Sequence, residues 1–478
     1  MTITSTAPAI PGADLTLVDA IVIGVGQAVG NVISSYTADG RRVAVFESDK
    51  PGGTCLNRGC RPTKAMRASA RIAHLARRAA DYGVGTGEVT VDFPAVVARK
   101  DEMIDAWAAG TVEWLTTDPG IDYRHVAGRL VADVPDDLAA GLHVVEGADG
   151  RRVVAPTVWL NTGTSPVVPQ IEGLDAVPHL DNDSILHLSE LPEHLIVLGG
   201  NYIGLEFGQM FSRFGSTVTV IERGARLAGR EEPEVSEELR RFLAAEGLDI
   251  RTGAGVTRVS KSETGGIVVT LDDADEIAGS HLLLAVGRHP NTRDIGLADV
   301  GVETDKRGYV IVDDHFATTV PGIFAVGDIN GRGAFTHTSY ADGEIAADNL
   351  AGGERSAGER IMTYAMFTDP PLGRVGSTEA EVRDAGINAL VATYEVKNVT
   401  KAVLDSETDG FVKILVDADT DQILGASFLG LFGDEVVQIV SALMHAQAPR
   451  RILQEMLPIH PTVGEFWPTI LKGLKPLD

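Results

Sequence analysis

Cysteine is scarce in this sequence, which has two, Cys55 and Cys60, among 478 residues. A structural zinc site needs four nitrogen or sulfur ligands, so two thiols alone cannot build one, and we predict no metal site. In a reducing compartment, two thiols are more often catalytic than structural. A redox pair is the favoured interpretation, and two buried cysteines that act as small apolar side chains are the alternative.

Positive charge and long apolar segments are also scarce. The sequence has 41 Lys and Arg against 67 Asp and Glu, a net charge of -26, and both nucleic acid and anionic membranes would repel such a surface. No apolar run reaches about 18 residues, and the N-terminus lacks the basic and apolar regions of a signal peptide. These absences predict a cytoplasmic protein with no nucleic-acid or membrane partner.

Both cysteines lie in the segment 52–64, GGTCLNRGCRPTK. On an ideal helix, residues five apart have Cα atoms roughly 8 to 9 Å apart, beyond the ~7 Å limit for a disulfide, so the backbone has to be irregular here. Gly59 permits unusual dihedral angles, and Pro62 lacks an amide hydrogen. Lys64 follows Cys60 by four residues, which places the two on one face of a helix that we predict over 62–82.

Two segments repeat a pattern that is typical of dinucleotide-binding units: an apolar strand, a glycine-rich turn, a helix, a second strand and an acid. The first comprises residues 18–47 with GVGQAVG at 24–30, and the second comprises residues 195–222 with GGNYIGLE at 199–206. Glycines let the backbone approach a pyrophosphate, and the terminal acid can accept a hydrogen bond from a ribose hydroxyl. A nicotinamide nucleotide beside a flavin is the simplest explanation for two such units.

Each unit departs from the glycine fingerprint at one position. Val29 stands where the first unit would have glycine or alanine, so a plain tight turn is the alternative there, and Asn201 replaces the middle glycine of the second. Asn tolerates a positive φ better than most residues, which would preserve the second turn. Glu222 favours NADH because its carboxylate would repel a 2′-phosphate, although Arg223 or Arg226 could bind the phosphate of NADPH.

The segment 52–64 resembles the redox-active motif of the class I pyridine nucleotide-disulfide oxidoreductases, flavoenzymes that include dihydrolipoyl dehydrogenase, glutathione and mycothione reductases, and mercuric reductase. Other segments resemble further motifs of this family: 158–164, where Asn161 replaces a more common alanine, 199–206, 287–291, 318–328 and 459–465. Segments 334–342 and 367–376 are most similar to the mercuric-reductase-like branch. The resemblance covers nearly the whole chain from Asp19.

This resemblance implies an α/β fold with two Rossmann-like dinucleotide-binding domains, one for FAD and one for NAD(P), and a C-terminal α+β dimerisation domain. The expected divisions are a flexible tail (1–17), the FAD domain (18–165 and 288–355), the NAD(P) domain (166–287) and the dimerisation domain (356–478). The expected partner is a second copy of the chain. The residue pattern also predicts a helix over 93–116 and antiparallel strands between 122 and 158.

Carried over residue by residue, the resemblance implies two sets of cofactor contacts. The expected FAD contacts are Gly24, Gly26, Glu47, Gly53, Thr54, Lys64, Thr162, Gly163, Arg288, Asp328 and Thr336. The expected NAD(P) contacts are Gly199, Gly200, Tyr202, Ile203, Gly204, Glu222 and Gly287.

The resemblance also implies the catalytic roles within one chain. Cys60 would lie nearer the flavin as a thiolate that Lys64 stabilises, and Cys55 would be the outer thiol that attacks the acceptor. Glu206 would pair with the same lysine beside the flavin. On its own, Glu206 is an ordinary helix-surface glutamate.

A C-terminal histidine completes the expected catalytic set. His460 would reach across the dimer to the outer thiol, and Glu465 would fix its tautomer and raise its basicity. Without the resemblance, a lone histidine on such a loop would usually be structural. Gly464 stands where serine or threonine is usual, which bears on how the following helix starts.

The expected activity is electron transfer from NAD(P)H through FAD and the Cys55/Cys60 disulfide to a disulfide acceptor. Arg58 and Arg61 indicate an anionic or polar acceptor. The alternatives are reduction of a soft metal ion, mercuric or copper, and dihydrolipoyl oxidation. Residues 473–478 lack the vicinal cysteine pair of a full mercuric reductase. A flavin redox sensor without turnover is a further alternative, although the residues it would be expected to lose are all present.

Overall fold

The computed structural model describes residues 15–133, 140–263 and 265–477. Its contacts divide the chain into two compact units. Unit 1 comprises Met1–Ala65, Val97–Val167 and Gly287–Arg360, and unit 2 comprises Met66–Val96, Val168–Val286 and Ile361–Asp478. The division into FAD, NAD(P) and dimerisation domains stays a prediction.

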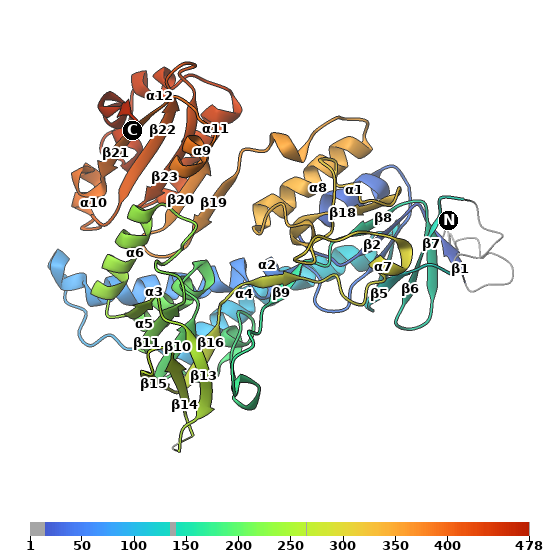
Figure 1. The fold of residues 1–478 in the computed structure, drawn as a ribbon, viewed down its shortest axis with the longest axis horizontal. Helices are drawn as coiled ribbons and strands as arrows, with labels where there is room; N and C mark the ends of the chain where they lie inside the picture. The colour runs from blue at the N-terminus through green and yellow to red at the C-terminus, as the bar shows by residue number, and fades with distance from the viewer. Residues whose placement is uncertain (1–14, 134–139, 264, 478) are drawn as a thin grey trace. The chain divides into compact units, whose positions relative to one another are not determined.

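The centre of unit 1 is a parallel five-stranded sheet in the order β18-β8-β2-β3-β4 (Figure 1). Its strands are β2 (Ala20–Ile23), β3 (Val43–Phe46), β4 (Ile121–Arg124), β8 (Val158–Leu160) and β18 (Ile323–Ala325). Every residue of β2 and β3 is buried, as expected for parallel strands covered on both faces. This burial is why two uninterrupted apolar runs predicted these strands.

A second sheet of unit 1 has the order β1-β7-β6-β5. Its strands are β1 (Leu15–Leu17), β5 (Gly128–Val131), β6 (His143–Gly147) and β7 (Arg152–Ala155). The last three form the expected antiparallel segment. The expected tail lies outside the described residues up to position 14, but Leu15–Leu17 form a strand because Leu15 is buried against Val131, Val144 and Val154.

The remaining elements of unit 1 carry most of the expected site residues. They are α1 (Val29–Ala38), α2 (Gly53–Asn57), β9 (Thr164–Pro166), β17 (Arg288–Pro290), α7 (Leu297–Val300), the 3-10 turn η4 (Gly327–Asn330) and α8 (Thr336–Leu350). Two long helices, α3 (Cys60–Arg77) and α4 (Phe93–Thr117), contribute residues to both units. The helix expected over 62–82 is therefore α3 followed by a separate 3-10 turn, Ala79–Tyr82.

Unit 2 contains a parallel sheet in the order β12-β11-β10-β16 and a three-stranded antiparallel sheet, β13-β14-β15. The elements are β10 (His194–Leu198), α5 (Tyr202–Phe214), β11 (Thr217–Glu222), α6 (Pro233–Ala245), β12 (Asp249–Thr252), β13 (Val256–Lys261), β14 (Ile267–Leu271), β15 (Glu276–Gly279) and β16 (His281–Leu284). Strand, turn, helix and strand thus follow one another from β10 to β11, as in unit 1 from β2 to β3.

The C-terminal part of unit 2 is a six-stranded antiparallel sheet in the order β19-β20-β23-β22-β21-β24 (Figure 1). Its strands are β19 (Thr363–Met366), β20 (Leu372–Gly376), β21 (Ala389–Glu395), β22 (Phe411–Asp417), β23 (Ile423–Leu429) and β24 (Lys475–Pro476). The helices here are α9 (Glu379–Asp384), α10 (Thr400–Leu404), α11 (Gly433–His445), α12 (Arg451–Glu455) and α13 (Trp467–Ile470). Trp467 is fully buried in their common core.

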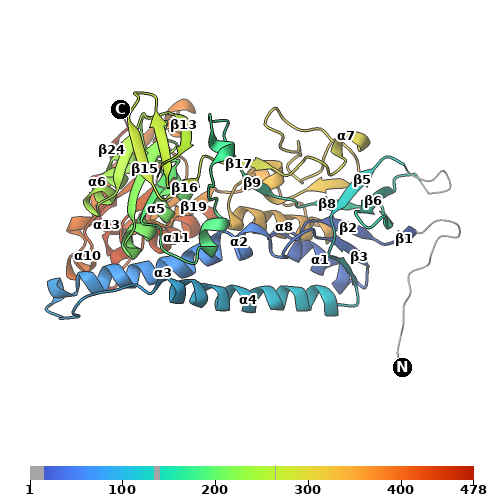
Figure 2. The same ribbon diagram turned by 90° about the horizontal axis from the view of Figure 1, so that it is seen from below.

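In unit 1, α1 and α8 lie side by side over the parallel sheet (Figure 2). A Cβ added at Gly343 of α8 would lie 2.0 Å from the Ala28 carbonyl oxygen, at the start of α1. Val29, which departs from the fingerprint, is completely buried in the core between the helices and the sheet. Close packing at the start of α1 therefore depends on a glycine in the facing helix.

Gly343→Ala should lower the free energy of unfolding by roughly 1–3 kcal/mol, because its methyl group forces α1 and α8 apart. Gly30→Ala is the matched control, since nothing lies within 4 Å of a Cβ there and alanine favours a helix by up to about 1 kcal/mol. Urea unfolding followed by circular dichroism measures both. Equal stability of the two variants would contradict the close contact.

Candidate active site

The two cysteines lie on either side of a helix break. The helix α2 ends at Asn57, Arg58 has a non-helical φ of -147°, and α3 begins at Cys60. A Cβ at Gly59 would lie 2.9 Å from the Thr54 carbonyl oxygen, so the break needs a glycine. Both residues are thiols in this structure, and the break brings them into hydrogen-bond contact.

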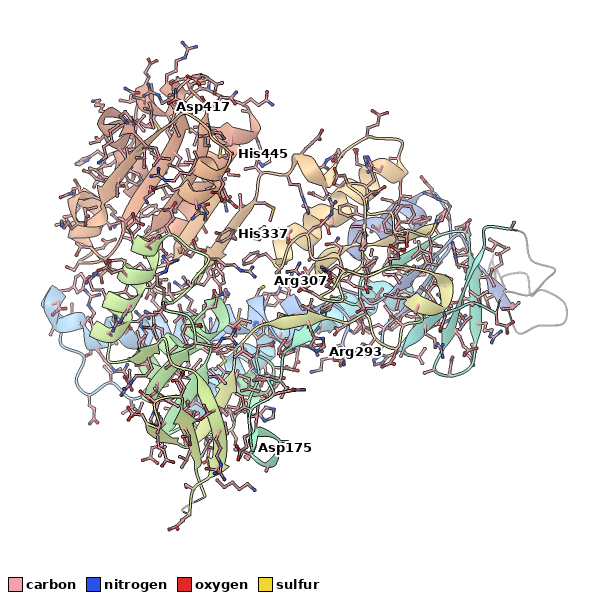
Figure 3. All side chains as sticks on the ribbon, viewed as in Figure 1. Asp175, Arg293, Arg307, His337, Asp417 and His445 are labelled. Carbon is pink, nitrogen blue, oxygen red and sulfur yellow. The ribbon has the colours of Figure 1, made fainter. Side chains whose placement is uncertain are left out.

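The two thiols differ in their surroundings. Hydrogen bonding to Cys60, and then burial, raise the pKa of Cys55 well above its ordinary value. Cys60 is exposed, and its Sγ lies 3.0 Å from the Thr336 hydroxyl at the start of α8. The next residue, His337, is labelled in Figure 3 and marks this end of the helix. The two thiols therefore differ in burial, in hydrogen-bond partners and, for Cys55, in a raised pKa.

Lys64 and Glu206 belong to different units. Lys64 is half-buried in the first turns of α3, one turn after Cys60. Glu206 lies in α5 and accepts a hydrogen bond of 2.8 Å from the backbone N–H of Phe367. Their pairing stays a prediction.

The first dinucleotide unit ends in a fixed carboxylate. Glu47 accepts hydrogen bonds from the N–H groups of Val25, at 2.7 Å, and Asp49, at 2.8 Å. Gly24 has a φ of +89°, and a Cβ there would lie 2.5 Å from the Asn161 carbonyl oxygen. Gly53 also has a positive φ and lies against this turn.

The strand β9 and the turn η4 supply a second polar group. Asp328 accepts hydrogen bonds from the hydroxyls of Ser339, at 3.1 Å, and Thr164, at 3.3 Å, and burial raises its pKa. Arg288 donates to Thr164 Oγ1 at 2.9 Å and to the Thr54 hydroxyl at 3.3 Å. Arg288 thereby joins β9 to the helix that carries Cys55.

Thr162 and Gly163 are two further residues that we expected to contact FAD. The Thr162 hydroxyl donates to the Asn291 carbonyl oxygen at 2.7 Å, and Gly163 has a φ of +66°. FAD requires glycine turns that let the backbone approach its pyrophosphate, and carboxylates that accept hydrogen bonds from its hydroxyl groups. The residues present therefore fit FAD.

The second dinucleotide unit has a cavity at its glycine turn. Glu222 accepts hydrogen bonds from the N–H groups of Gly200 and Gly224. The cavity has a volume of about 390 Å³ and is lined by Gly200, Asn201, Glu222, Gly224, Ala225, Arg226, Gly229 and Arg230. A fixed carboxylate and two arginines thus face the same space.

The Asn201 turn differs from the sequence expectation. Its φ is -118°, so no positive φ is needed there, and the Asn201 side chain instead caps α5 by accepting from the Tyr202 N–H. The positive φ falls on Gly199, at +115°, and Gly287 has one of +131°. A Cβ at Gly204 would lie 1.9 Å from the Gly199 carbonyl oxygen, so α5 starts in close contact with the turn.

Glu231 is a buried glutamate that the sequence did not indicate as a site residue. It holds Tyr202, and Ile203 is the next residue of α5. The Tyr202 hydroxyl donates to Glu231 at 2.6 Å, and Tyr364 donates to the same oxygen at 3.1 Å. Arg374 lies 3.4 Å from the other oxygen of Glu231. Burial raises the pKa of Tyr202 well above its ordinary value. No periodicity or motif in the sequence marks Glu231.

His460 is on the surface of unit 2, with its side chain 70% exposed. Its Nδ1 lies 2.8 Å from Glu465 Oε2, which also accepts from the Thr462 N–H at 3.3 Å. Thr462 and Glu465 form a capping box, so a helical turn starts here despite Gly464. The structure thus brings His460 and Glu465 together.

Apolar side chains next to His460 are also exposed. Leu457 is 96% exposed and Ile459 is 78% exposed. Both residues lie between α12 and the helical turn that starts at Val463. Among the residues that the structure describes, no group of three metal-ligating side chains occurs and no helix is long and apolar enough to cross a membrane.

Known proteins match nearly the whole chain. The family described as pyridine nucleotide-disulphide oxidoreductase matches residues 18–343, and its dimerisation domain matches residues 362–470. A mercuric reductase from Streptomyces lividans is 36% identical over 425 residues, covering 88% of each chain. A dihydrolipoyl dehydrogenase from Chlamydia pneumoniae is 31% identical over 451 residues, covering 94% of this chain and 95% of the relative.

A third relative has a solved structure. The probable pyridine nucleotide-disulfide oxidoreductase RclA from Escherichia coli K12 is 33% identical over 451 residues, covering 93% of this chain and 97% of RclA. The Cu(II) complex of this HOCl-induced flavoprotein disulfide reductase matches with a TM-score of 0.84 at 32% identity, covering 95% of this chain and 99% of that chain.

These matches confirm the resemblance and the expected fold class. The C-terminal match is to the family's dimerisation domain, which indicates a homodimer. The chain belongs to the pyridine nucleotide-disulphide oxidoreductase family, and it is a flavoprotein disulfide oxidoreductase that uses FAD and a pyridine nucleotide.

Proposed function

We propose that the protein reduces a negatively charged disulfide with NADH, passing two electrons through FAD and the Cys55–Cys60 pair. The observation that carries this proposal is the contact between two thiols in unlike surroundings, a buried Cys55 with a raised pKa and an exposed Cys60 beside Thr336. Both thiols belong to unit 1, which also holds the turns that fit FAD. The turns with Gly24, Gly163 and Asp328 would hold FAD, which would supply two-electron transfer between the nicotinamide and the disulfide.

The reduced pair then carries out two thiol–disulfide exchanges. Cys55, once deprotonated, attacks one sulfur of the acceptor RSSR, forms a mixed disulfide and releases RS⁻, which takes up a proton. Cys60 attacks the sulfur of Cys55, re-forms the internal disulfide and releases the second thiol. In total, NADH, one proton and RSSR become NAD⁺ and two RSH.

Cys55 needs a base because its pKa is raised. In the proposed homodimer, His460 of the partner subunit removes this proton and returns it to the leaving thiolate. The exposure of His460 and its contact with Glu465 support this role. We place the reaction in the cytoplasm, where NADH is supplied and thiols stay reduced.

Anaerobic NADH should add two alkylatable thiols per chain, which mass spectrometry after alkylation should locate at Cys55 and Cys60. A long-wavelength absorbance band from a thiolate beside the flavin should appear with them. Cys60→Ser should lose the band, whereas Cys55→Ser should keep a thiolate at Cys60 and lose disulfide reduction. Flavin reduction without new thiols would instead identify a diaphorase or oxidase, and reducible thiols without turnover on any acceptor would identify a sensor.

Glu222 supports NADH as the donor. Two backbone N–H groups hold its carboxylate at the rim of the cavity, where it can accept from a ribose hydroxyl and repels a 2′-phosphate. Arg226 and Arg230 line the same cavity and could bind that phosphate if the carboxylate were removed.

Glu222→Ser should therefore lower the ratio of the KM for NADPH to the KM for NADH by about tenfold or more, because NADH loses a charge-assisted contact and NADPH loses a repulsion. Steady-state rates with a common disulfide acceptor measure this ratio. Glu276→Ser, at an exposed position of β15, is the control and should leave the ratio unchanged. A wild-type preference for NADPH would refute the assignment of the donor.

Arg61 supports a negatively charged acceptor. It directly follows Cys60, and its guanidinium lies 5.0 Å from the ring centroid of Trp107, a side chain that is 43% exposed on α4. Among the described residues Arg61 makes no hydrogen bond or ion pair, whereas Arg58 is ion-paired with Asp49. Stacking orients the Arg61 guanidinium and leaves its N–H groups available to an anion.

Arg61→Gln should lower the ratio of kcat/KM for dithiodipropionate, a dianionic disulfide, to kcat/KM for cystamine, a dicationic one, by about tenfold or more. Arg58→Gln is the matched control, and its charge is already paired, so the ratio between the two substrates should change less than about threefold. The anionic preference should also weaken as salt is added. A wild-type preference for cystamine, or equal effects of the two variants, would overturn this assignment while leaving disulfide reduction intact.

Reduction of a soft metal ion is the second candidate, with two Cu(II) reduced to Cu(I) or one Hg(II) reduced to metal per NADH. The observation that favours it is the Cu(II) complex of RclA, together with the mercuric reductase among the relatives. In this chain the ion would be bound by the thiols of Cys55 and Cys60. Arg61→Gln should not lower such a rate, since the arginine repels a metal cation, so this variant separates the two candidates.

A further inference from the structure

Asn161 lies between three turns of unit 1. It directly follows β8, and only 6% of it is exposed. Its side-chain Oδ1 accepts from the Gly26 N–H at 2.9 Å, and its Nδ2 donates to the Val326 carbonyl oxygen at 2.7 Å. Its own backbone N–H donates to the Ile23 carbonyl oxygen at 2.8 Å. One residue therefore connects the turn after β2, the end of β8 and the turn after β18.

Three glycines pack directly against this residue. A Cβ at Gly24 would lie 2.5 Å from the Asn161 carbonyl oxygen, and one at Gly26 would lie 2.5 Å from its Oδ1. A Cβ at Gly327 would lie 2.6 Å from its Nδ2. The absence of a side chain at Gly26 and Gly327 is thus required by the Asn161 amide, in addition to any requirement of a bound dinucleotide.

The three connected turns are the ones that fit FAD. They contain Gly24 and Gly26, then Thr162 and Gly163, and then Asp328. The family more commonly has alanine at the position of Asn161, and alanine could make neither side-chain hydrogen bond. Because the Gly26 N–H donates to Asn161, it is not available to donate to a pyrophosphate.

We propose that Asn161 is a positioning residue that locks the three turns together and thereby holds the FAD site in its binding shape before FAD arrives. Binding is tighter when the loops that contact a ligand are already ordered. Asn161 touches the turns and not the reacting atoms, so its effect falls on FAD retention. This inference rests on FAD occupying these turns, as proposed above.

Asn161→Ala should speed the release of FAD from the holoenzyme about tenfold or more, because two buried hydrogen bonds that fix the site are lost. Release is followed by the rise of flavin fluorescence after dilution. Asn182→Ala is the matched control, since Asn182 is a buried asparagine of unit 2. It should release FAD at the wild-type rate.

Asn161→Asp separates positioning from packing because it keeps the shape of the side chain. Below its pKa, which burial raises, the protonated carboxyl can still accept from the Gly26 N–H and donate to the Val326 carbonyl. Above that pKa it has no hydrogen to donate, and its charge is repelled by the same carbonyl. FAD release from this variant should therefore approach the wild-type rate at about pH 5.5 and be roughly a hundredfold faster at about pH 8.5.

The outcomes distinguish this inference from the proposal on which it rests. Wild-type protein that purifies without flavin would refute the FAD assignment itself. If wild type holds FAD, but Asn161→Ala releases it at the wild-type rate and Asn161→Asp shows no extra pH dependence, Asn161 only packs the core and the inference is wrong. If Asn161→Ala does not fold, the pH dependence of FAD release from Asn161→Asp, relative to wild type, decides between positioning of the FAD site and packing of the core.

Discussion

The helix break between Asn57 and Cys60 is the constraint on which the site depends. A continuous helix would hold residues five apart too far from each other for sulfur chemistry, and the break closes this distance while leaving α3 free to start at the second cysteine. The close approach to the Thr54 carbonyl allows no Cβ at Gly59. The same local geometry also makes the thiols unequal, because Cys55 turns into the protein and Cys60 stays exposed.

The sequence predicted those parts of the fold and site that depend on residues close together in the chain. The apolar runs that became β2, β3, β10 and β11 were readable because parallel strands are buried on both faces. The need for an irregular backbone between the cysteines followed from helix geometry alone. Which of the two cysteines lies nearer the flavin was implied only by the family resemblance.

What the sequence could not reveal depends on contacts between distant residues. The ring of Tyr202 is held by a glutamate 29 positions away, and Asn161 bonds to an N–H 135 positions away. The prediction of a positive φ at Asn201 was wrong, because φ is negative there and the Asn201 side chain caps α5. Likewise Leu15–Leu17 are ordered by a strand partner more than a hundred residues downstream, which composition alone could not indicate.

The exposed Leu457 and Ile459 beside His460 have a consequence for how the enzyme comes into being. A single chain would expose these apolar side chains to solvent, and under the proposed mechanism its site would lack the histidine of the partner subunit. Burying these groups against a second chain would remove the hazard and supply the missing base in the same event. Under the proposed mechanism, covering these apolar side chains and completing the site would then be one step, so an unpaired subunit would be both exposed and inactive.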